Sequence, residues 1–529
     1  MKQDTQDIWL KSRGYLHLTQ KINIAEEGKS IKAKITNKNF VAKHAFFPLI
    51  HCVIKERKFK KVKTDGSTIR KHSYKDPEKG EYVQTAKKRP LHYATHIDSL
   101  IFGYYASVLQ EKYEAELAKF AGLSKCITAY RRIEHNQEGY NKSTIHFAHE
   151  AFEQIKSLAS ANGCQVLTFD LKSFFSTLDH KVLKRAWYQL FGLDTLPPDH
   201  YNVFKAATNF SYVLLDDLRI SPDKMGRKSG FDEKRLAELR SKGIQAFFES
   251  PEELRNKIQS KELPVFKNPF RNKQKQLIGI PQGLPISAVL ANLYLLEFDK
   301  QVFEHLVCQL GCYYRRYSDD ILIISEQKDC KKVEDFISEM LRRFKVDLSK
   351  DKTEKFCFKT ILDDKNNSKV ISIRTIEGKE HLGLPLNYLG FEFYGDKTLI
   401  KSANLAKFYR RMIEAVKRSG RHIRKAKHKS PFASNELFKK RIFKLYSFHG
   451  NKKRLTYKAT KRLEKDALGR YRFVKYELNK PKKGRGNYFT YLKRASELMQ
   501  EPSIKRQAHK HYRVLHQAID KHITQKLSD

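Results

Sequence analysis

The sequence has no run of apolar residues long enough to cross a bilayer, and it shows neither a signal-peptide pattern nor a lipid-attachment motif. We therefore expect no membrane partner. Cysteine is also scarce: the 529 residues include seven, without the paired spacing of a zinc site or a disulfide framework. Cys308 and Cys312 share a helical face but have no second ligand pair, so reduced thiols in a cytoplasmic protein fit best.

Acidic residues are too few to balance the basic ones. Lysine and arginine number 104 against 59 aspartates and glutamates, which gives a formal net charge of +45. Self-repulsion at this charge opposes compact folding, so we expect the excess to meet a polyanion. Nucleic acid is the leading candidate, because cations that bind phosphates release condensed counterions. A hydrophobic content of 40% still permits a packed core, and the length permits more than one domain.

The amino-acid composition and the apolar pattern change twice along the chain. Residues 1–90 are polar, basic and irregular, and the turn signal Asp65-Gly66 predicts either a basic hairpin or a solvated loop. Residues 91–400 mix helical periodicity, which predicts a helix over residues 98–120, with short apolar strands. A charged segment at 215–263 has few apolar anchors and reads as an insertion or a peripheral helical segment. Residues 401–529 are basic, helical and dotted with aromatics. This order predicts an α+β catalytic region followed by an α-helical C-terminal domain.

Three aspartates stand at the ends of apolar segments. Asp170 ends a predicted buried strand, and Asp319 and Asp320 lie at the tip of a predicted hairpin over residues 312–325. Phosphoryl transfer to a nucleic-acid 3′ end uses two divalent ions roughly 3.5–4 Å apart. Magnesium takes carboxylate oxygens as ligands. Because adjacent strand residues face opposite sides, we assign Asp319 as the main ligand and Asp320 as a supporting one.

Five ordered motifs around these acids resemble those of reverse transcriptases. They are Phe169–Phe175 (FDLKSFF), Gly279–Ser287 (GIPQGLPIS), Tyr317–Asp320 (YSDD), Leu348–Thr353 (LSKDKT) and Tyr388–Phe391 (YLGF). The resemblance implies a right-hand polymerase with fingers, palm and thumb that copies RNA into DNA. Ser318 stands where many relatives carry a small apolar residue, and a position beside the turn should tolerate it.

The resemblance also assigns roles to single residues. Asp170, Leu171, Asp319 and Asp320 would hold two Mg²⁺ ions, with Mn²⁺ as an alternative. Phe175 would lie under the incoming sugar and exclude a 2′-hydroxyl, although ordinary core packing is the competing interpretation. The other residues implied are Arg131, Lys142, Gln282, Gly283 and Lys352 at the nucleotide, and Tyr388, Leu389 and Gly390 in the primer grip.

Cations alternate with aromatic rings in the C-terminal region. Positive charges suit phosphates and rings suit bases, so this region is expected to grip the template and primer. The same rings could instead pack between helices, beside solvated charges. The residues concerned are Arg410, Arg411, Arg472, Tyr488 and Tyr491.

Among reverse transcriptases, the chain is most similar to the bacterial abortive-infection and defence-associated group, in which a polymerase core is followed by a helical domain. It shows neither a ribonuclease-H-like set of carboxylates nor a Cys/His endonuclease module. The similarity implies anti-phage defence with a non-coding RNA, dNTP substrates, a DNA product and, in some members, self-assembly. The alternatives are a group II intron or retron enzyme, an RNA-dependent RNA polymerase, and a non-catalytic, maturase-like RNA-binding protein.

Overall fold

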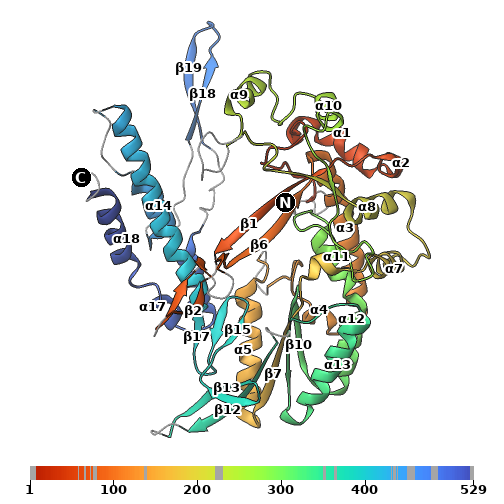
Figure 1. Ribbon diagram of the computed structural model, residues 1–529, viewed down its shortest axis with the longest axis vertical. Helices are drawn as coiled ribbons and strands as arrows, with labels where there is room; N and C mark the ends of the chain where they lie inside the picture. Colours follow the sequence, from red (N-terminus) through yellow and green to blue (C-terminus); the bar gives the residue numbers. More distant parts are fainter. Residues whose placement is uncertain are drawn as a thin grey trace. The chain divides into compact units, whose positions relative to one another are not determined.

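The computed structural model of the protein describes residues 8–57, 59–64, 67–71, 73–75, 80–135, 140–220, 230–349, 353–362, 366–430, 432, 437, 439–448, 459–477 and 486–524. The chain divides into two compact units. The first comprises Met1–Arg131, Thr168–Ile323 and Asp329–Thr353; the second comprises Arg132–Leu167, Ile324–Lys328 and Glu354–Asp529. Figure 1 shows their helices and strands, and the predicted α+β class is confirmed. No helix in the described ranges is long and apolar enough to span a membrane.

The structure of the N-terminal residues differs from one expectation and confirms another. We expected an irregular extension, but helix α1 (Ile24–Thr36) begins after Asn23, whose side chain accepts a hydrogen bond from the Ala25 amide. It buries Ile31 and Ile35, an apolar stripe that the surrounding lysines concealed in the sequence. The basic hairpin is confirmed, because β2 (Lys60–Thr64) pairs antiparallel with β3 (Ser67–Lys71).

The first unit also contains a four-stranded sheet and a set of helices. The sheet order is β6-β1-β8-β9. Its strands are β6 (Ala86–Tyr93), β1 (Leu49–Arg57), β8 (Ser211–Leu214) and β9 (Phe266–Lys267). The helix predicted at 98–120 is α3 (His96–Ala118). The other helices are α2 (Lys38–Lys43), α4 (Leu123–Cys126), α7 (His180–Leu190), α8 (Pro198–Thr208), α11 (Ser287–Tyr294), α12 (Leu296–Val302) and α13 (Cys330–Arg343).

The segment 215–263 has more buried apolar residues than the sequence led us to expect. Helices α9 (Glu233–Ser241) and α10 (Pro251–Gln259) carry their charges outward and bury leucines inward. The side chains buried here are Leu236, Leu239, Phe247, Phe248, Leu254 and Leu263, which pack with Leu18, Ile50 and Val213. The described residues of this segment are helical in part, as one of the two expectations held, and they contribute to a hydrophobic core.

The second unit contains antiparallel strands and the basic C-terminal helices. Strands β12 (Glu354–Leu362), β13 (Ser368–Ile376) and β14 (Lys379–Leu382) lie in that order, and a separate sheet contains β15 (Leu386–Tyr388), β16 (Phe391–Phe393) and β17 (Thr398–Ile400). Its helices are α5 (Thr144–Ala161), α14 (Ser402–Lys429), α15 (Lys439–Tyr446), α16 (Tyr488–Leu498), α17 (Ser503–Arg506) and α18 (His511–Ile519). The hairpin of β18 (Ala459–Lys465) and β19 (Tyr471–Glu477) interrupts a region that we expected to be entirely helical.

One close contact explains how α14 packs in this unit. A Cβ built on Gly420 would lie 2.6 Å from the carbonyl oxygen of His522. Only glycine allows the helix and the C-terminal segment to approach so closely. The buried face of α14 continues through Phe408, Met412 and Val416, while most of its lysines and arginines stay on the other side.

Acidification is expected to destabilise the first unit through His17. The imidazole is fully buried; its Nδ1 accepts from the Leu18 amide (2.8 Å) and its Nε2 contacts the Tyr93 carbonyl (2.9 Å). Burial lowers the pKa of His17 to about 3. The unfolded chain therefore binds the extra proton first, and stability should fall as pH decreases from about 6.5 toward 3, by roughly 1.4 kcal/mol per pH unit for this group.

Urea unfolding measured between pH 7 and pH 5 tests this, with His17→Gln as the comparison. Glutamine cannot take up the proton, so the variant should show a shallower loss of stability. Equal pH slopes in both proteins would contradict the assignment.

Candidate active site

The structure brings two of the predicted aspartates to one place in the first unit. Asp170 is the last residue of β7 (Cys164–Asp170), and β7 neighbours β11 (Asp320–Ser325), which follows β10 (Tyr313–Tyr317) through a tight turn. The amide of Leu171 donates to the carbonyl of Asp319 (3.1 Å). The carbonyl of Asp170 accepts from the Ser349 amide (2.9 Å). Backbone hydrogen bonds therefore join residues from three segments that are distant in the sequence.

The turn between β10 and β11 has a strained conformation. Ser318 has φ +60°, in the left-handed region, which costs a non-glycine residue about 1–3 kcal/mol. Its hydroxyl donates to the phenol oxygen of Tyr130 (3.1 Å), and Tyr130 is itself at φ +61°. Asp319 is half-buried, whereas Asp320, the first residue of β11, is exposed. The predicted division between a main and a supporting ligand stays a prediction.

A fully buried ion pair supports the turn, because its arginine donates a hydrogen bond to the Ser318 carbonyl. Arg316 on β10 and Asp299 on α12 both have 0% exposure, and the guanidinium donates twice to the carboxylate, at 2.7 and 2.5 Å. Its third nitrogen, Nη1, donates to the carbonyl of Ser318 (3.2 Å) and to the Asn292 side-chain oxygen (3.2 Å). The Tyr314 hydroxyl donates to the same carboxylate (2.6 Å). Each polar group of this cluster is thus satisfied without water.

The electrostatics of the cluster follow from its burial. Burial alone would lower the pKa of Arg316, but the adjacent Asp299 carboxylate raises it above its ordinary value. Burial raises the pKa of Tyr314 well above its usual value, and Asp299 adds to this shift. Nearer the turn, burial also raises the pKa of Tyr317, with Tyr130 and Asp320 contributing. At neutral pH the guanidinium is charged and the phenols are neutral hydrogen-bond donors.

The two motifs predicted to contact the nucleotide are also joined. The Ile280 amide donates to the carbonyl of Phe175 (2.8 Å), and the Gly279 amide donates to that of Leu178 (2.7 Å). Phe175 is half-buried, whereas the preceding Phe174 is buried against Tyr294, at 6.3 Å between ring centroids. The core-packing role therefore belongs mainly to Phe174, which leaves part of the Phe175 ring accessible.

The Gln282-Gly283 step lies against β6. The His92 amide donates to the Gln282 carbonyl (2.7 Å), and Gly283 has φ +114°. A Cβ at position 283 would lie 2.4 Å from the His92 carbonyl oxygen, so this close approach requires glycine. The motif is thereby anchored to a strand that the sequence did not connect with it.

The predicted triphosphate contacts are engaged within the protein. Arg131 contacts Glu114 and also donates to the carbonyls of Ser124 and Ile127 (both 2.5 Å). In the second unit, Lys142 donates to Glu150 (2.6 Å). Their roles toward a nucleotide remain predictions. Lys352 lies outside the described residues.

The segment predicted as the primer grip is a tight hairpin in the second unit. Tyr388 at the end of β15 is buried, and β15 pairs antiparallel with β16. The turn consists of Leu389 (φ +45°) and Gly390 (φ +93°). Leu389 and Gly390 are both half-buried, and their role in a primer grip stays a prediction.

Four of the predicted nucleic-acid contacts have described side chains. Arg410 and Arg411 on α14 are exposed, whereas Tyr488 and Tyr491 on α16 are half-buried. The Tyr488 ring stacks on Phe408 at 4.4 Å between centroids. The tyrosines therefore take part in helix packing, as the competing interpretation held, while the arginines face solvent. For Arg472, only its backbone position in β19 is described.

The donor set suits a hard divalent cation. In the part of the chain that the structure describes, no group of three or more His, Cys, Asp or Glu side chains is arranged to hold a metal ion. Magnesium, however, commonly takes one or two carboxylates and completes its shell with water and substrate phosphates. Asp170 and Asp319, whose segments meet at the hydrogen bond from the Leu171 amide to the Asp319 carbonyl, would be such a pair, and this role stays a prediction.

Sequence reasoning missed the residues that support the site. These residues are Tyr130, Asp299, Arg316 and His92, none of which belongs to a predicted motif. An arginine inside the apolar strand before Asp319 was the one available signal, because a buried charge requires a partner.

One family model matches a segment that contains four of the five motifs, and the motif Phe169–Phe175 lies outside it. Residues 225–393 match the family model described as reverse transcriptase (RNA-dependent DNA polymerase), which is less than half of the chain. Asp319, Asp320, Gln282 and Gly283 lie inside this segment. No curated protein matches the sequence.

Solved structures with a similar arrangement include telomerases. Apo telomerase from Candida Tropicalis truncated from its C-terminal domain has 13% identity and a TM-score of 0.33 over 66% of this chain and 57% of that one. Telomerase from Candida albicans with a fragment of telomeric RNA has 11% identity and a TM-score of 0.32, over 72% and 53%. The chain thus spans little more than half the length of these proteins. From the family match, the protein contains a reverse transcriptase domain within residues 225–393.

Proposed function

We propose that the protein is an RNA-directed DNA polymerase whose active site contains Asp170 and Asp319. In this reaction the primer 3′-oxygen bonds to the α-phosphorus of a dNTP, and pyrophosphate leaves. The observation that carries the proposal is the hydrogen bond from the Leu171 amide to the Asp319 carbonyl (3.1 Å), which joins the segment that carries Asp170 to the segment that carries Asp319, and the latter lies in the reverse-transcriptase match.

Different residues of the chain would bind the metal ions, position the nucleotide and support the turn at Ser318. Asp170 and Asp319, with Asp320 and the Leu171 carbonyl nearby, would hold two Mg²⁺ ions. Bound metal would lower the charge barrier at the attacking and leaving oxygens. Gln282 and Gly283 would position the nucleotide, because the close approach of Gly283 to His92 fixes their backbone. Arg316 would maintain the turn that presents Asp319.

A primer-extension assay tests the proposal. An RNA template with a DNA primer, Mg²⁺ and each of the four labelled dNTPs should give a complementary DNA product. The same assay with NTPs should give little product. Efficient ribonucleotide incorporation would instead indicate an RNA polymerase, and strong RNA binding without any incorporation would indicate a maturase-like binding protein.

Phe175 is expected to select deoxynucleotides. Removing the ring in Phe175→Ala opens space for a 2′-hydroxyl, and discrimination based on one small group is worth roughly 10–200-fold. We expect the ratio of kcat/KM for dNTP over NTP to fall by about tenfold or more. Phe175→Tyr keeps the ring and should keep the ratio. An unchanged kcat/KM ratio in the alanine variant would mean that Phe175 serves only in core packing.

The biological part of the proposal is anti-phage defence in the bacterial cytoplasm with a partner non-coding RNA as template. Its support is the similarity of the motifs to defence-associated reverse transcriptases and the basic helical region over residues 401–529, which would serve as thumb and C-terminal domain. Sequencing RNA that co-purifies with the protein, together with phage plaque counts in cells with and without the gene, tests it. A diverse RNA pool with unchanged plaque counts would contradict this part while leaving the polymerase assignment intact.

A further inference from the structure

Tyr130 is an exposed aromatic residue close to the turn that carries Asp319. Its exposed fraction is 48%, although the three residues before it, at positions 127–129, are buried. Its backbone lies in the left-handed region, at φ +61°, as does that of Ser318, at φ +60°. Non-glycine residues keep this strained conformation only where their surroundings enforce it, and such residues cluster at functional sites. An exposed ring gains little from burial, so the contacts of Tyr130 must account for its position.

The chain before Tyr130 is fixed to β10. The segment runs parallel to the end of this strand, and the Thr128 amide donates to the Arg316 carbonyl (3.0 Å). The Asn292 side chain donates to the Ala129 carbonyl (3.0 Å), and its oxygen accepts from the Arg316 guanidinium (3.2 Å). Thr128 and Ala129 are therefore tied to the same buried arginine that supports the turn, directly in one case and through Asn292 in the other.

The residue after Tyr130 is fixed as well. The side chain of Arg131 is 3% exposed. It contacts Glu114 and donates to the carbonyls of Ser124 and Ile127 (both 2.5 Å). Tyr130 is thus held between two anchored neighbours, which is the kind of surrounding structure that maintains a left-handed backbone.

One hydrogen bond joins the side chain of Tyr130 to the turn. The Ser318 hydroxyl donates to the phenol oxygen (3.1 Å), and Ser318 is 4% exposed, so little water competes for this bond. From the other side, the Arg316 guanidinium donates to the Ser318 carbonyl (3.2 Å). Ser318 is therefore held through both its side chain and its main chain, one residue before Asp319. Without the phenol contact, Ser318 can relax from its strained φ, and the carboxylate of the next residue turns with it.

We infer that Tyr130 is a positioning residue for the Asp319 carboxylate and acts through the Ser318 hydroxyl rather than by contact with substrate. The inference rests on the proposed polymerase function. It adds to the site a residue that lies outside the matched segment 225–393 and outside the five motifs. A carboxylate that is already oriented binds a divalent ion without further ordering of the turn, which favours both metal affinity and the rate of the chemical step.

Tyr130→Phe keeps the ring and removes the hydroxyl. We expect kcat for primer extension to fall roughly three- to tenfold, the effect of about one hydrogen bond, and the affinity for Mn²⁺ to fall by a similar factor. Mn²⁺ affinity would be measured without nucleic acid, from the electron paramagnetic resonance signal of the free ion. The Kd for an RNA template–DNA primer duplex, measured without metal or nucleotide, should stay unchanged. A loss confined to this Kd would place the phenol on the substrate and overturn the inference.

Ser318→Ala removes the other hydroxyl and shows whether Tyr130 acts through it. Both variants lose the same hydrogen bond, so Tyr130→Phe/Ser318→Ala should be no worse in kcat than the more impaired single variant. Losses that multiply in the double variant would mean that the two side chains act independently, which contradicts the inference. Wild-type kcat and Mn²⁺ affinity in Tyr130→Phe would contradict it as well.

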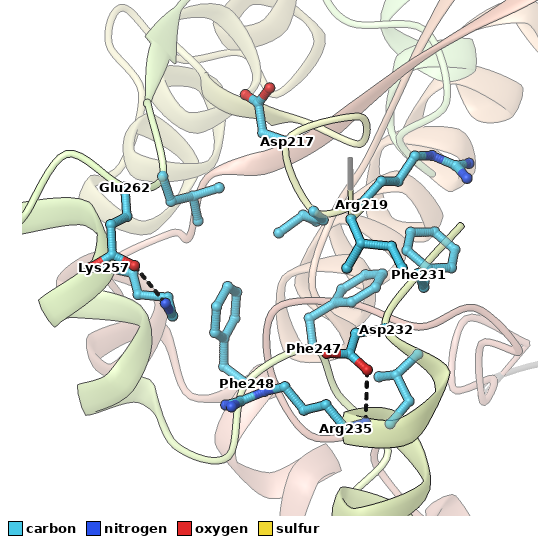
Figure 2. Close-up of a pocket in the computed structure, with 13 residues that line it drawn as sticks. Asp217, Arg219, Phe231, Asp232, Arg235, Phe247, Phe248, Lys257 and Glu262 are labelled. Atoms are coloured by element: carbon cyan, nitrogen blue, oxygen red, sulfur yellow. Dashed lines mark hydrogen bonds and ion pairs between the residues drawn. The ribbon is translucent and has the colours of Figure 1, made fainter. Parts of the chain in front are cut away.

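Two further variants control for the loss of a polar contact elsewhere in the first unit. Tyr15→Phe is the matched change, because the Tyr15 phenol donates to the Ala94 carbonyl (2.8 Å). Lys257→Gln breaks the pair with Glu262 (2.7 Å), on the wall of a cavity of about 300 Å³ whose lining includes no residue of the Ser318 turn (Figure 2). Both controls should retain kcat and Mn²⁺ affinity, and circular dichroism melting would confirm that every variant is folded. An equal loss of kcat in the controls would indicate a general loss of stability and overturn the inference.

The two proposals fail differently. If the wild type extends no primer but its Mn²⁺ affinity depends on the Tyr130 and Ser318 hydroxyls, the positioning role stands and the polymerase assignment falls. If extension proceeds normally but neither kcat nor Mn²⁺ affinity responds to Tyr130→Phe, the polymerase assignment stands and the positioning role is wrong.

Discussion

Replacing Asp319 by asparagine is expected to reduce nucleotide incorporation by about a thousandfold. The amide keeps the size of the side chain but removes the charge that would hold divalent ions. Metal ions contribute several kcal/mol of transition-state stabilisation, and each 1.36 kcal/mol corresponds to a factor of ten in rate. Single-turnover extension of a labelled primer at saturating dNTP measures the loss in the chemical step.

The fold should tolerate this change. Asp319 contacts Leu171 through its main-chain carbonyl, and the turn is held by Ser318 and Arg316, none of which is altered. Asp396→Asn, at an exposed position on the second unit, is the control and should retain activity. A melting temperature equal to the wild type with activity also retained would exclude Asp319 from the active site.

Replacing Asp299 by alanine is expected to destabilise the protein by roughly 3–5 kcal/mol. The change leaves the Arg316 guanidinium buried with its main acceptor removed, and a buried charge without a partner is costly. The Tyr314 hydroxyl loses its acceptor as well. Urea unfolding monitored by circular dichroism measures the loss. If a partly folded population remains, its incorporation rate should also fall, because the Ser318 turn loses its support.

A double replacement separates the free-energy cost of burying an unpaired charge from the net contribution of the ion pair to stability. Asp299→Leu/Arg316→Met removes both charges and should be less destabilising than Asp299→Ala, because apolar side chains leave no unpaired charge. The exposed pair Lys331–Asp335 on α13 is the matched control; Lys331→Ala should leave the unfolding midpoint nearly unchanged. Equal stability of Asp299→Ala and the wild type would mean that water reaches Arg316.

Local patterns predicted the elements around the candidate active site well. The strand ending at Asp170, the hairpin carrying Asp319 and the long helix α3 all lie where periodicity and turn signals placed them. These elements depend on residues adjacent in the chain, so their propensity and apolar spacing were readable directly. The order of the five motifs was also sufficient to indicate reverse transcriptase chemistry, which the family match over residues 225–393 supports.

Segments with mixed composition were harder to read. Lysines obscured the buried stripe of α1, and the charges of α9 and α10 concealed a core cluster that includes Leu236 and Leu254. Burial there depends on partners from other parts of the chain, such as Leu18 and Ile50. The hairpin of β18 and β19 was missed because the basic composition of residues 401–529 favoured a helical interpretation, although the aromatic and β-branched residues of β19 favour a strand.

By itself, the sequence determined the charge of the protein, the reverse-transcriptase motifs and the acids that would carry the chemistry. Only the tertiary structure decided what supports them: the buried partnership of Arg316 with Asp299, the approach of Gly283 to His92, and the contact of Ser318 with Tyr130. The physical reason is that these contacts join residues far apart in the sequence. A hydrogen bond or a buried charge is satisfied by whichever group the fold brings near, and sequence spacing carries no record of that partner.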